Sequence, residues 1–496
     1  MFRLLLTVIF SALATSTLAA AEPLALGERR ELFVDHFLIE KLSGAELRLH
    51  EPRDEGVTMK FDAPWEGGFC NYVTVIRDES RILLYYRGKP KASNDGQDEV
   101  TCVAESSDGI HWTKPKLGLF AFNGSKENNI IWAESPTAHN FSPLLDTNPA
   151  AVPAQRFKAL GGTIESGLLA FVSPDGVRWE KLRQQPVLTK AAVQKALGSP
   201  YMFDSQNVAF WSPSEKKYVS YFRVAKDNIR RIARAESVDF VNWSNLQLME
   251  YRTAEGTPAP LEHLYLNQTY PYPRAPHIYV SLAARFMPDR QVITADEAKA
   301  LNMVDAHTYM KDTSDGIFQT TRGGNIYYRT FMGVFIRPGI GLSHWVSRTN
   351  YPALGVVQTG ESEMSCYIVG NYAQPTAHLR RLSLRLDGFA SVAASYKGGE
   401  LLTKPLTFSG SQLLINFSTS AAGGIRVEIQ DESGKPLPGY TLADSIELIG
   451  NEIERAVRWK SGPDVSKLAG QPIRLRFVIK DADVYALRFG TPDTRR

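Results

Sequence analysis

Short runs of alternating hydrophobic and polar positions extend along most of the chain. Residues 72–76 and 82–87 are rich in β-branched and aromatic side chains and are separated by a polar turn. Residues 207–211 and 218–223 repeat this order around a Ser-Pro-Ser turn. Runs of this kind, bounded by turn formers, are typical of β-hairpins. The pattern therefore predicts antiparallel strands that recur as four-stranded meanders.

A Ser-x-Asp-Gly-x-x-Trp motif divides the chain into units of similar length. It occurs at residues 106–112 and 173–179 and, with Phe in place of Gly, at 237–243. The spacing of about 65 residues indicates a repeat architecture. Fainter echoes at 314–318 and 386–389 extend the series to five units.

The motif itself predicts turns rather than catalysis. Asp108, Asp175 and Asp239 have the sequence context of side chains that accept hydrogen bonds from nearby backbone amides, and Gly supplies a positive φ. The Trp that ends each motif is expected to pack between sheets.

Five meanders of this size suit the blades of a propeller, whose radial packing leaves short sheet edges. The predicted fold class is therefore all-β, with a five-bladed β-propeller over residues 30–393. A short helical pattern at 295–301 is expected to decorate the fourth unit. The rhythm changes after residue 394, and alternating runs such as 413–417 and 473–478 predict a C-terminal β-sandwich accessory domain over 395–496.

The N-terminus has the order of a secretory signal. Arg3 precedes a mostly apolar run at 4–18, and small residues follow at 19–21. This order predicts a signal peptide over residues 1–21 and a secreted or periplasmic mature protein. No later run approaches the roughly 18 apolar residues of a membrane helix, so no membrane span is expected in the mature protein.

Charge and cysteine content narrow the functional classes. The formal net charge is +3, and no basic tract is interleaved with aromatics, so no nucleic-acid partner is expected. Cys70, Cys102 and Cys366 are too few for a disulfide framework. A bridge between Cys70 and Cys102 remains an alternative to three buried thiols.

No cofactor and no essential metal are predicted. His263 and His277 lack the spacing of a zinc motif. The acidic loop at 94–99 lacks the full pattern of an EF-hand and is interpreted as a solvated turn.

The polar residues that open each unit carry the candidate chemistry. The innermost strand of a propeller blade faces the axis, where an unpaired polar group is costly. Glycoside hydrolysis needs paired carboxyl groups, because one protonates the leaving oxygen while the other attacks or activates water. The predicted catalytic carboxylates are Asp146, Asp204, Glu262 and Glu361. The alternative for Asp146 and Asp204 is hydrogen bonding to backbone amides at strand starts.

Other polar residues near the predicted openings are candidates for substrate binding. Arginine and histidine side chains there can bind hydroxyls or an anionic group such as a sulfate or uronate. The predicted substrate-binding residues are Asn71, Asn207, His263, Arg274, His277 and Arg337.

Segments 107–115, 145–149 and 203–207 resemble the five-bladed propeller glycosidases of the invertase, levansucrase and arabinanase superfamily, which includes glycosyl hydrolase families 32 and 43. The resemblance covers residues 30–393. It implies an Asp nucleophile or base in blade one, an Asp that stabilises the transition state in blade two and a Glu acid in a later blade. Asp146 matches the second position, and the acid falls near Asp204, with Glu262 as its rival. Blade one offers Asn71, which cannot act as a carboxylate nucleophile.

Together these features predict a secreted glycoside hydrolase that cleaves a polysaccharide or oligosaccharide with paired carboxylates in the propeller axis. The alternative is a non-catalytic carbohydrate-binding propeller, which Asn71 favours. A protein-interaction scaffold is a third reading, because fold alone does not fix function.

Overall fold

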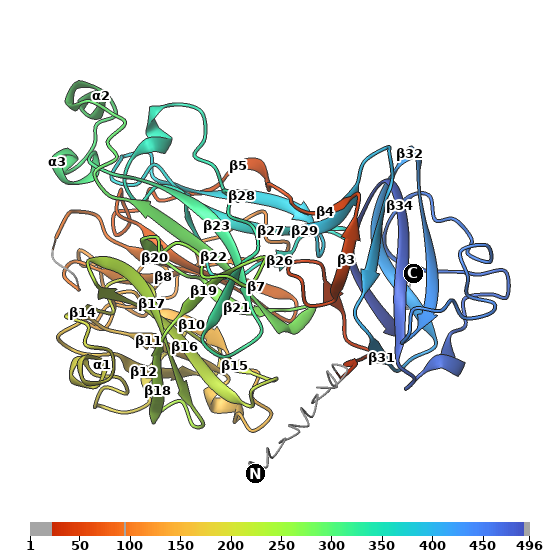
Figure 1. The fold of residues 1–496 in the computed structure, drawn as a ribbon. Coiled ribbons are helices and arrows are strands. Elements are labelled where there is room, and N and C mark those ends of the chain that lie inside the picture. The colour runs from red at the N-terminus through yellow and green to blue at the C-terminus, as the bar shows by residue number, and fades with distance from the viewer. Residues whose placement is uncertain (1–21, 94–95, 491–496) are drawn as a thin grey trace, which may run out of the picture.

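The computed structural model describes residues 22–93 and 96–490, and the described strands form six sheets. Five sheets of four to six strands are arranged as the blades of a propeller, and the sixth, of ten strands, forms a separate β domain (Figure 1). The prediction of an all-β five-bladed propeller is confirmed. The predicted signal peptide at 1–21 lies outside the described residues.

Blades one and two each consist of four antiparallel strands in chain order. Blade one contains β6 (Asn71–Asp78), β7 (Arg81–Gly88), β8 (Val100–Ser106) and β9 (Ile130–Trp132). Blade two contains β10 (Ser142–Leu145), the 3₁₀ turn η1 (Pro153–Gln155), β11 (Phe157–Gly161), β12 (Leu169–Ser173) and β13 (Glu180–Lys181).

The innermost strands of blades three and four are interrupted. Blade three follows helix α1 (Lys190–Leu197) and contains β14 (Tyr201–Met202), β15 (Val208–Ser212), β16 (Lys217–Lys226), β17 (Ile229–Ser237) and β18 (Trp243–Leu248). Blade four contains β20 (Leu264–Leu266), β21 (Thr269–Tyr272), β22 (Ala275–Met287), β23 (Thr313–Thr321) and β24 (Ile326–Arg329), and β19 (Glu250–Thr253) pairs with β24 in parallel. Helices α2 (Ala295–Ala300) and α3 (Ala306–Tyr309) project from blade four, and α2 confirms the predicted helical insertion (Figure 1).

Blade five closes the ring with a strand from the other end of the chain. After the 3₁₀ turn η2 (Leu342–Trp345), the blade contains β25 (Tyr351–Pro352), β26 (Val357–Gln358), β27 (Glu363–Gly370) and β28 (His378–Arg385). Its outermost strand is β5 (Arg53–Lys60), which pairs antiparallel with β28. The propeller proper therefore spans residues 53–385.

The β domain combines both ends of the described chain. It contains β1 (Leu24–Gly27), β2 (Glu31–Leu32), β3 (Ile39–Ser43), β4 (Ala45–Leu49), β29 (Ala390–Ala394), β30 (Gly399–Thr403), β31 (Leu406–Phe408), β32 (Gln412–Asp431), β33 (Asn451–Ala456), the 3₁₀ turn η3 (Ser466–Leu468) and β34 (Ile473–Gly490). The domain boundary thus differs from the predicted 395–496, because residues 24–49 pair with strands more than 340 positions away. All ten strands join in one hydrogen-bonded sheet.

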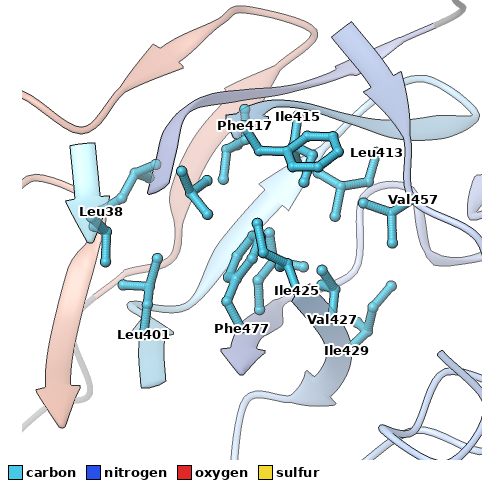
Figure 2. Close-up of a cluster of buried hydrophobic side chains, with 14 of the residues drawn as sticks. Leu38, Leu401, Leu413, Ile415, Phe417, Ile425, Val427, Ile429, Val457 and Phe477 are labelled. Atoms are coloured by element: carbon cyan, nitrogen blue, oxygen red, sulfur yellow. The ribbon is translucent and has the colours of Figure 1, made fainter. Parts of the chain in front are cut away.

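The core of this β domain is aliphatic and aromatic. Its long strands β32 and β34 pair along most of their lengths and place alternate side chains on one face. Figure 2 shows this cluster, in which Phe417, Ile425 and Phe477 have no exposed surface. Burial of such side chains contributes about 1.5–3 kcal/mol each, so the domain holds a core of its own.

The repeated motif forms turns, as predicted, and also joins neighbouring blades. Asp175 Oδ1 accepts hydrogen bonds from the amides of Val177 and Arg178, both at 2.8 Å. In blade one, the Tyr85 hydroxyl reaches across and donates to Gly176 O at 3.0 Å. Tyr367 of blade five donates in the same way to Gly109 O. The turn after the third strand of a blade therefore accepts a hydrogen bond from a tyrosine of the preceding blade and links the two blades. We call this contact the latch.

This latch predicts a specific stability loss. A Cβ at Gly176, where φ is +76°, would meet Tyr85 Oη at 2.5 Å, whereas Gly118, at φ +71°, has no described heavy atom within 4 Å of its Cβ position. Both alanine variants carry the left-handed backbone strain, and Gly176→Ala adds overpacking of about 1–3 kcal/mol. We expect denaturant unfolding to show a loss larger than that of Gly118→Ala by at least about 1 kcal/mol. Equal losses would contradict the latch.

Two further sequence expectations have different outcomes. Asp387 follows the third strand of blade five, as the motif requires, but Asp315 lies within β23 and is paired with Arg285 Nη2 at 2.6 Å. The echo at 314–318 is therefore not a turn.

The three cysteines are buried and unpaired in the described structure. No described helix is long and apolar enough to cross a membrane.

Candidate functional site

Each of the five blades opens with a residue in the left-handed backbone region. Non-glycine residues rarely adopt positive φ, and strained positions of this kind concentrate at functional sites. The openings contain Tyr72 (φ 56°), Asn140 (φ 51°), Phe203 (φ 65°), Gln268 (φ 37°) and Asn350 (φ 71°). We call the side chains gathered at these openings the axial cluster.

A buried ring of polar groups crosses the axis beneath the axial cluster. Gln268 Nε2 donates to Gln206 Oε1 at 2.7 Å and to Pro352 O at 2.8 Å. Gln206 Nε2 in turn donates to Thr74 Oγ1 and Ser142 Oγ. One group from each blade takes part, and neither glutamine has exposed surface. The ring therefore lies below any ligand that binds at the openings, and we call it the polar floor.

Asp204 is the carboxylate at the opening of blade three. Its side chain is 19% exposed, accepts a hydrogen bond from Tyr201 Oη at 2.8 Å and is ion-paired with Arg223. Burial alone would raise the pKa of Asp204, but Arg223, His139 and other positive neighbours hold it below its usual range. Asp204 is therefore ionised at neutral pH and partly accessible.

A buried Glu-His pair lies beside Asp204. Glu99 Oε2 contacts His139 Nδ1 at 2.8 Å, and Glu99 Oε1 lies 3.5 Å from Arg87 and 2.6 Å from Lys89. Burial disfavours the charged form of Glu99, yet Arg87 and His139 outweigh it and hold its pKa well below the usual range. The Glu99 carboxylate accepts a hydrogen bond from His139 Nδ1 and so orients the imidazole beside Asp204.

The arginines of the axial cluster stack on aromatic rings. The Arg223 guanidinium lies 4.1 Å from the Tyr265 ring centre, and Arg87 lies 4.5 Å from that of Tyr72. Arg348 lies over Tyr265 at 5.3 Å and over rings from α3 and blade five. Cation–π contact stabilises such stacks and keeps the guanidinium planes fixed.

A second carboxyl, Asp312, reaches the cluster from the insertion of blade four. It directly precedes β23 and is partly buried, and its Oδ1 has no hydrogen-bond partner among the described residues. Burial raises its pKa above the usual range, although Ser347 and Arg348 act in the opposite direction. Asp312 and Arg223 both act electrostatically on Tyr351. Asp204 and Asp312 thus both lie near Arg348, and their pKa values shift in opposite directions.

Several buried polar atoms in the cluster lack protein partners. In native structures most buried polar atoms are hydrogen-bonded, so a concentration of exceptions indicates bound water or ligand. Within the described part of the chain, the unpartnered atoms at the openings include Asn71 Nδ2, Asn140 Oδ1, Ser205 Oγ, Asn207 Oδ1, Tyr351 Oη and Arg348 Nε. The openings therefore present donors and acceptors to a polar ligand.

The other end of the axis is different in character. A cavity of about 600 Å³ lies where the inner strands end, and its walls include Leu144, Phe210, Trp211, Tyr270 and Val356. No carboxylate lines it among the described residues. Chemistry that needs carboxyl groups is therefore favoured at the openings, above the polar floor.

Asp146 lies at the end of β10 rather than at its opening. Its side chain has no exposed surface and is ion-paired with Lys158. Tyr218 Oη donates to it at 2.6 Å, and it accepts from the Asn148 amide at 2.9 Å. Residues 139–142 open this blade instead. The catalytic prediction for Asp146 is therefore not supported by its position, which favours a structural role.

This position predicts a stability effect for Asp146→Asn. Removal of one partner from a buried ion pair costs about 3–5 kcal/mol, because it leaves a buried charge uncompensated. We expect a loss of about 3 kcal/mol in denaturant unfolding, with part of it recovered in the double variant that adds Lys158→Met. Loss of activity at unchanged stability would instead place Asp146 in the chemistry.

The other two predicted carboxylates also lie apart from the axial cluster. Glu262 is paired with Arg285 at 2.9 Å and with Arg329, and these cations outweigh burial and lower its pKa. Glu361 is exposed in the turn before β27. Neither residue is brought next to Asp204 by a described contact.

The predicted substrate-binding residues separate into two groups. Asn71 and Asn207 lie in the axial cluster, and His263 borders it, because its Nδ1 accepts from the Arg230 amide at 3.4 Å. Arg274 and His277 instead lie at the junction with the β domain. Arg274 pairs at 2.9 Å with Asp387, in the turn after blade five, and His277 lies 2.9 Å from Glu31 of β2 in the β domain. Arg337 is exposed and pairs with Glu51 at 2.9 Å.

Sequence reasoning missed most of the axial cluster. Arg87 and Arg223 each follow two aromatic residues at the end of a buried run, and this shared pattern was a usable signal. The residues Glu99, His139, Asp312 and Arg348 lie in connecting segments, where the sequence does not show which loops meet. Within the described ranges, no group of three or more His, Cys, Asp or Glu side chains is arranged to hold a metal ion.

No family model matches the chain, and no curated protein matches it in sequence. Solved structures with a similar fold do match. One described as a glycoside hydrolase is 11% identical, with a TM-score of 0.44 and coverage of 68% of this chain and 92% of that one. A GH32 β-fructofuranosidase from Bombyx mori is 12% identical, with a TM-score of 0.38 and coverage of 88% and 95%. An N-acetylgalactosamine deacetylase from F. plautii, in complex with blood group B trisaccharide, is 13% identical, with a TM-score of 0.41 and coverage of 70% and 97%.

Two of these three structures are described as glycosidases, and all three TM-scores lie below 0.5.

Proposed function

We propose that the protein is a glycoside hydrolase whose active site is the axial cluster. The observation that carries the proposal is the presence of two carboxyls, Asp204 and Asp312, that both interact electrostatically with Arg348 and have pKa values shifted in opposite directions. Such a pair can divide the roles of base and acid, because the lowered pKa favours the ionised form of Asp204 while the raised pKa extends the protonated form of Asp312 to higher pH.

In this mechanism the ionised Asp204 acts on the anomeric carbon, directly or through a water molecule. Asp312 donates its proton to the leaving glycosidic oxygen. The unpartnered Asn71 Nδ2 and Asn207 Oδ1 offer a hydrogen-bond donor and an acceptor to the hydroxyls of a sugar. The N-terminal sequence supports action outside the cytoplasm, after removal of residues 1–21.

A non-catalytic carbohydrate-binding propeller is the second candidate. Blade one presents Asn71 where the related glycosidases are expected to have a carboxylate, and Asp204 is held in an ion pair with Arg223. Both features suit binding without cleavage.

A glycan panel separates the two functions. Purified wild-type protein and Asp204→Asn are incubated with plant, algal and microbial polysaccharides, and released reducing ends are measured beside binding. Release by the wild type that disappears in Asp204→Asn supports the hydrolase. Retention of a glycan by both proteins without any release supports the binder.

A further inference from the structure

Positive charge at the axial cluster exceeds the carboxyl groups available to neutralise it. Glu99 is shared by two cations, and Asp204 is paired with one. The basic side chains of the cluster and its border are Arg87, Lys89, Arg223, Arg230 and Arg348. The carboxyls that face them are Glu99, Asp204 and Asp312, so five basic side chains face three carboxyls, and burial raises the pKa of Asp312.

Among the side chains that the structure describes, Arg348 has no carboxylate ion-pair partner, and neither does Arg230. Among residues 22–93 and 96–490, no carboxylate lies within 4.0 Å of the Arg348 guanidinium. Its Nη1 donates to Tyr309 Oη at 3.3 Å, and its buried Nε has no partner in the described part of the chain. Its backbone is left-handed, with φ of 60°, so the side chain is held in place at a conformational cost.

Three guanidinium groups surround a single ring. Arg223, Arg348 and Arg230 lie 4.1, 5.3 and 5.5 Å from the centre of Tyr265. Like charges at such separations repel, and partly buried charges without counterions are costly. Arg348 is partly exposed, so a ligand can reach it. An anion that binds there would supply the missing negative charge.

We propose that the axial cluster binds a glycan that carries an oxyanion, either a carboxylate or a sulfate, and that Arg348 binds this group. The planar guanidinium fork matches two oxygens of such an anion. The unpartnered amides nearby would bind the sugar hydroxyls. The inference rests on the proposed function for its sugar component and adds the charge of the substrate.

Two matched pairs of probes test this proposal by calorimetry at low ionic strength. The first pair is an oligogalacturonate and its methyl ester, and the second is a sulfated galactan oligosaccharide and its desulfated form. We expect the anionic member of one pair to bind at least about tenfold more tightly than its neutral counterpart. Preference in the first pair identifies a uronate, and preference in the second identifies a sulfate ester. Equal affinity, or no binding, in both pairs would overturn the proposal.

Variants locate the effect at Arg348. Arg348→Gln should remove the preference for the anionic probe, and Arg348→Lys should retain part of it, because the charge remains while the fork is lost. Arg337→Gln removes an exposed arginine that is paired with Glu51 and serves as the matched control, with the preference unchanged. Thermal unfolding checks that each variant is folded. A preference that survives in folded Arg348→Gln contradicts the assignment.

Cleavage assays on the same probes separate this inference from the proposed function. Preferential binding of an anionic probe with no cleavage of any glycan would support the charge inference and count against the hydrolase. Cleavage of neutral glycans without any preference for the anionic form would leave the hydrolase standing and overturn the charge inference.

Discussion

Asp204→Asn is expected to reduce glycan cleavage by at least about 10³-fold, because it removes the ionised carboxylate of the axial cluster while it retains the shape of the side chain. Initial rates of reducing-end release, measured below the unfolding temperature of both proteins, check this expectation. The variant also leaves Arg223 without its partner, so a loss of stability accompanies the loss of activity.

Asp146→Asn is the matched control for this result, because Asp146 is also a buried, ion-paired carboxylate but lies at the end of its inner strand. The account predicts loss of stability with preserved activity for Asp146→Asn, and loss of activity beyond any effect on stability for Asp204→Asn. The reverse pattern would restore the assignment made from sequence alone.

Asp312→Asn is expected to reduce kcat by about 10²–10⁴-fold on natural glycans, because the leaving oxygen no longer receives a proton. Aryl glycosides with acidic phenol leaving groups need little protonation, so the variant should lose far less activity on them. An equal loss on both substrate types would exclude Asp312 as the acid.

The pH dependence provides a second readout for Asp312. Because burial raises its folded pKa, the proton persists to higher pH than on an ordinary carboxyl. Activity of the wild type should fall as pH rises through this folded pKa, and the stability contributed by protonation should fall over the same interval. Both changes should be absent in Asp312→Asn, whose unfolding temperature at neutral pH should equal or exceed that of the wild type. An alkaline limb that persists in the variant would contradict the assignment.

The repeat pattern predicted the fold well because it records local chemistry. The side chains of each Ser-x-Asp-Gly turn accept hydrogen bonds from backbone amides of the same turn, as at Asp108 and Asp175. The motif can therefore be recognised in the sequence wherever it occurs. The closing strand β5 and the strands at 24–49 were not predictable in this way, since their partners lie at least 318 residues away. Register across such distances is set by tertiary packing.

The candidate site was predictable where polar residues open an inner strand. Asp204 and Asn207 were found because residues 203–207 break the buried pattern of blade three. Asp146 was placed at an opening because the four residues of β10 are too short to reveal where the strand begins. Arg348 and Asp312 come from long connections, and their convergence depends on how the insertion of blade four folds over the axis.

A crystal structure of Asp204→Asn in complex with a glycan that binds the wild type tests the central claim most directly. The account predicts a sugar at the blade openings, above the ring formed by Gln206 and Gln268, in contact with Tyr265, Arg348 and the introduced amide at position 204. A sugar bound instead in the apolar cavity beside Trp211 and Tyr270, with the openings occupied by water alone, would contradict it.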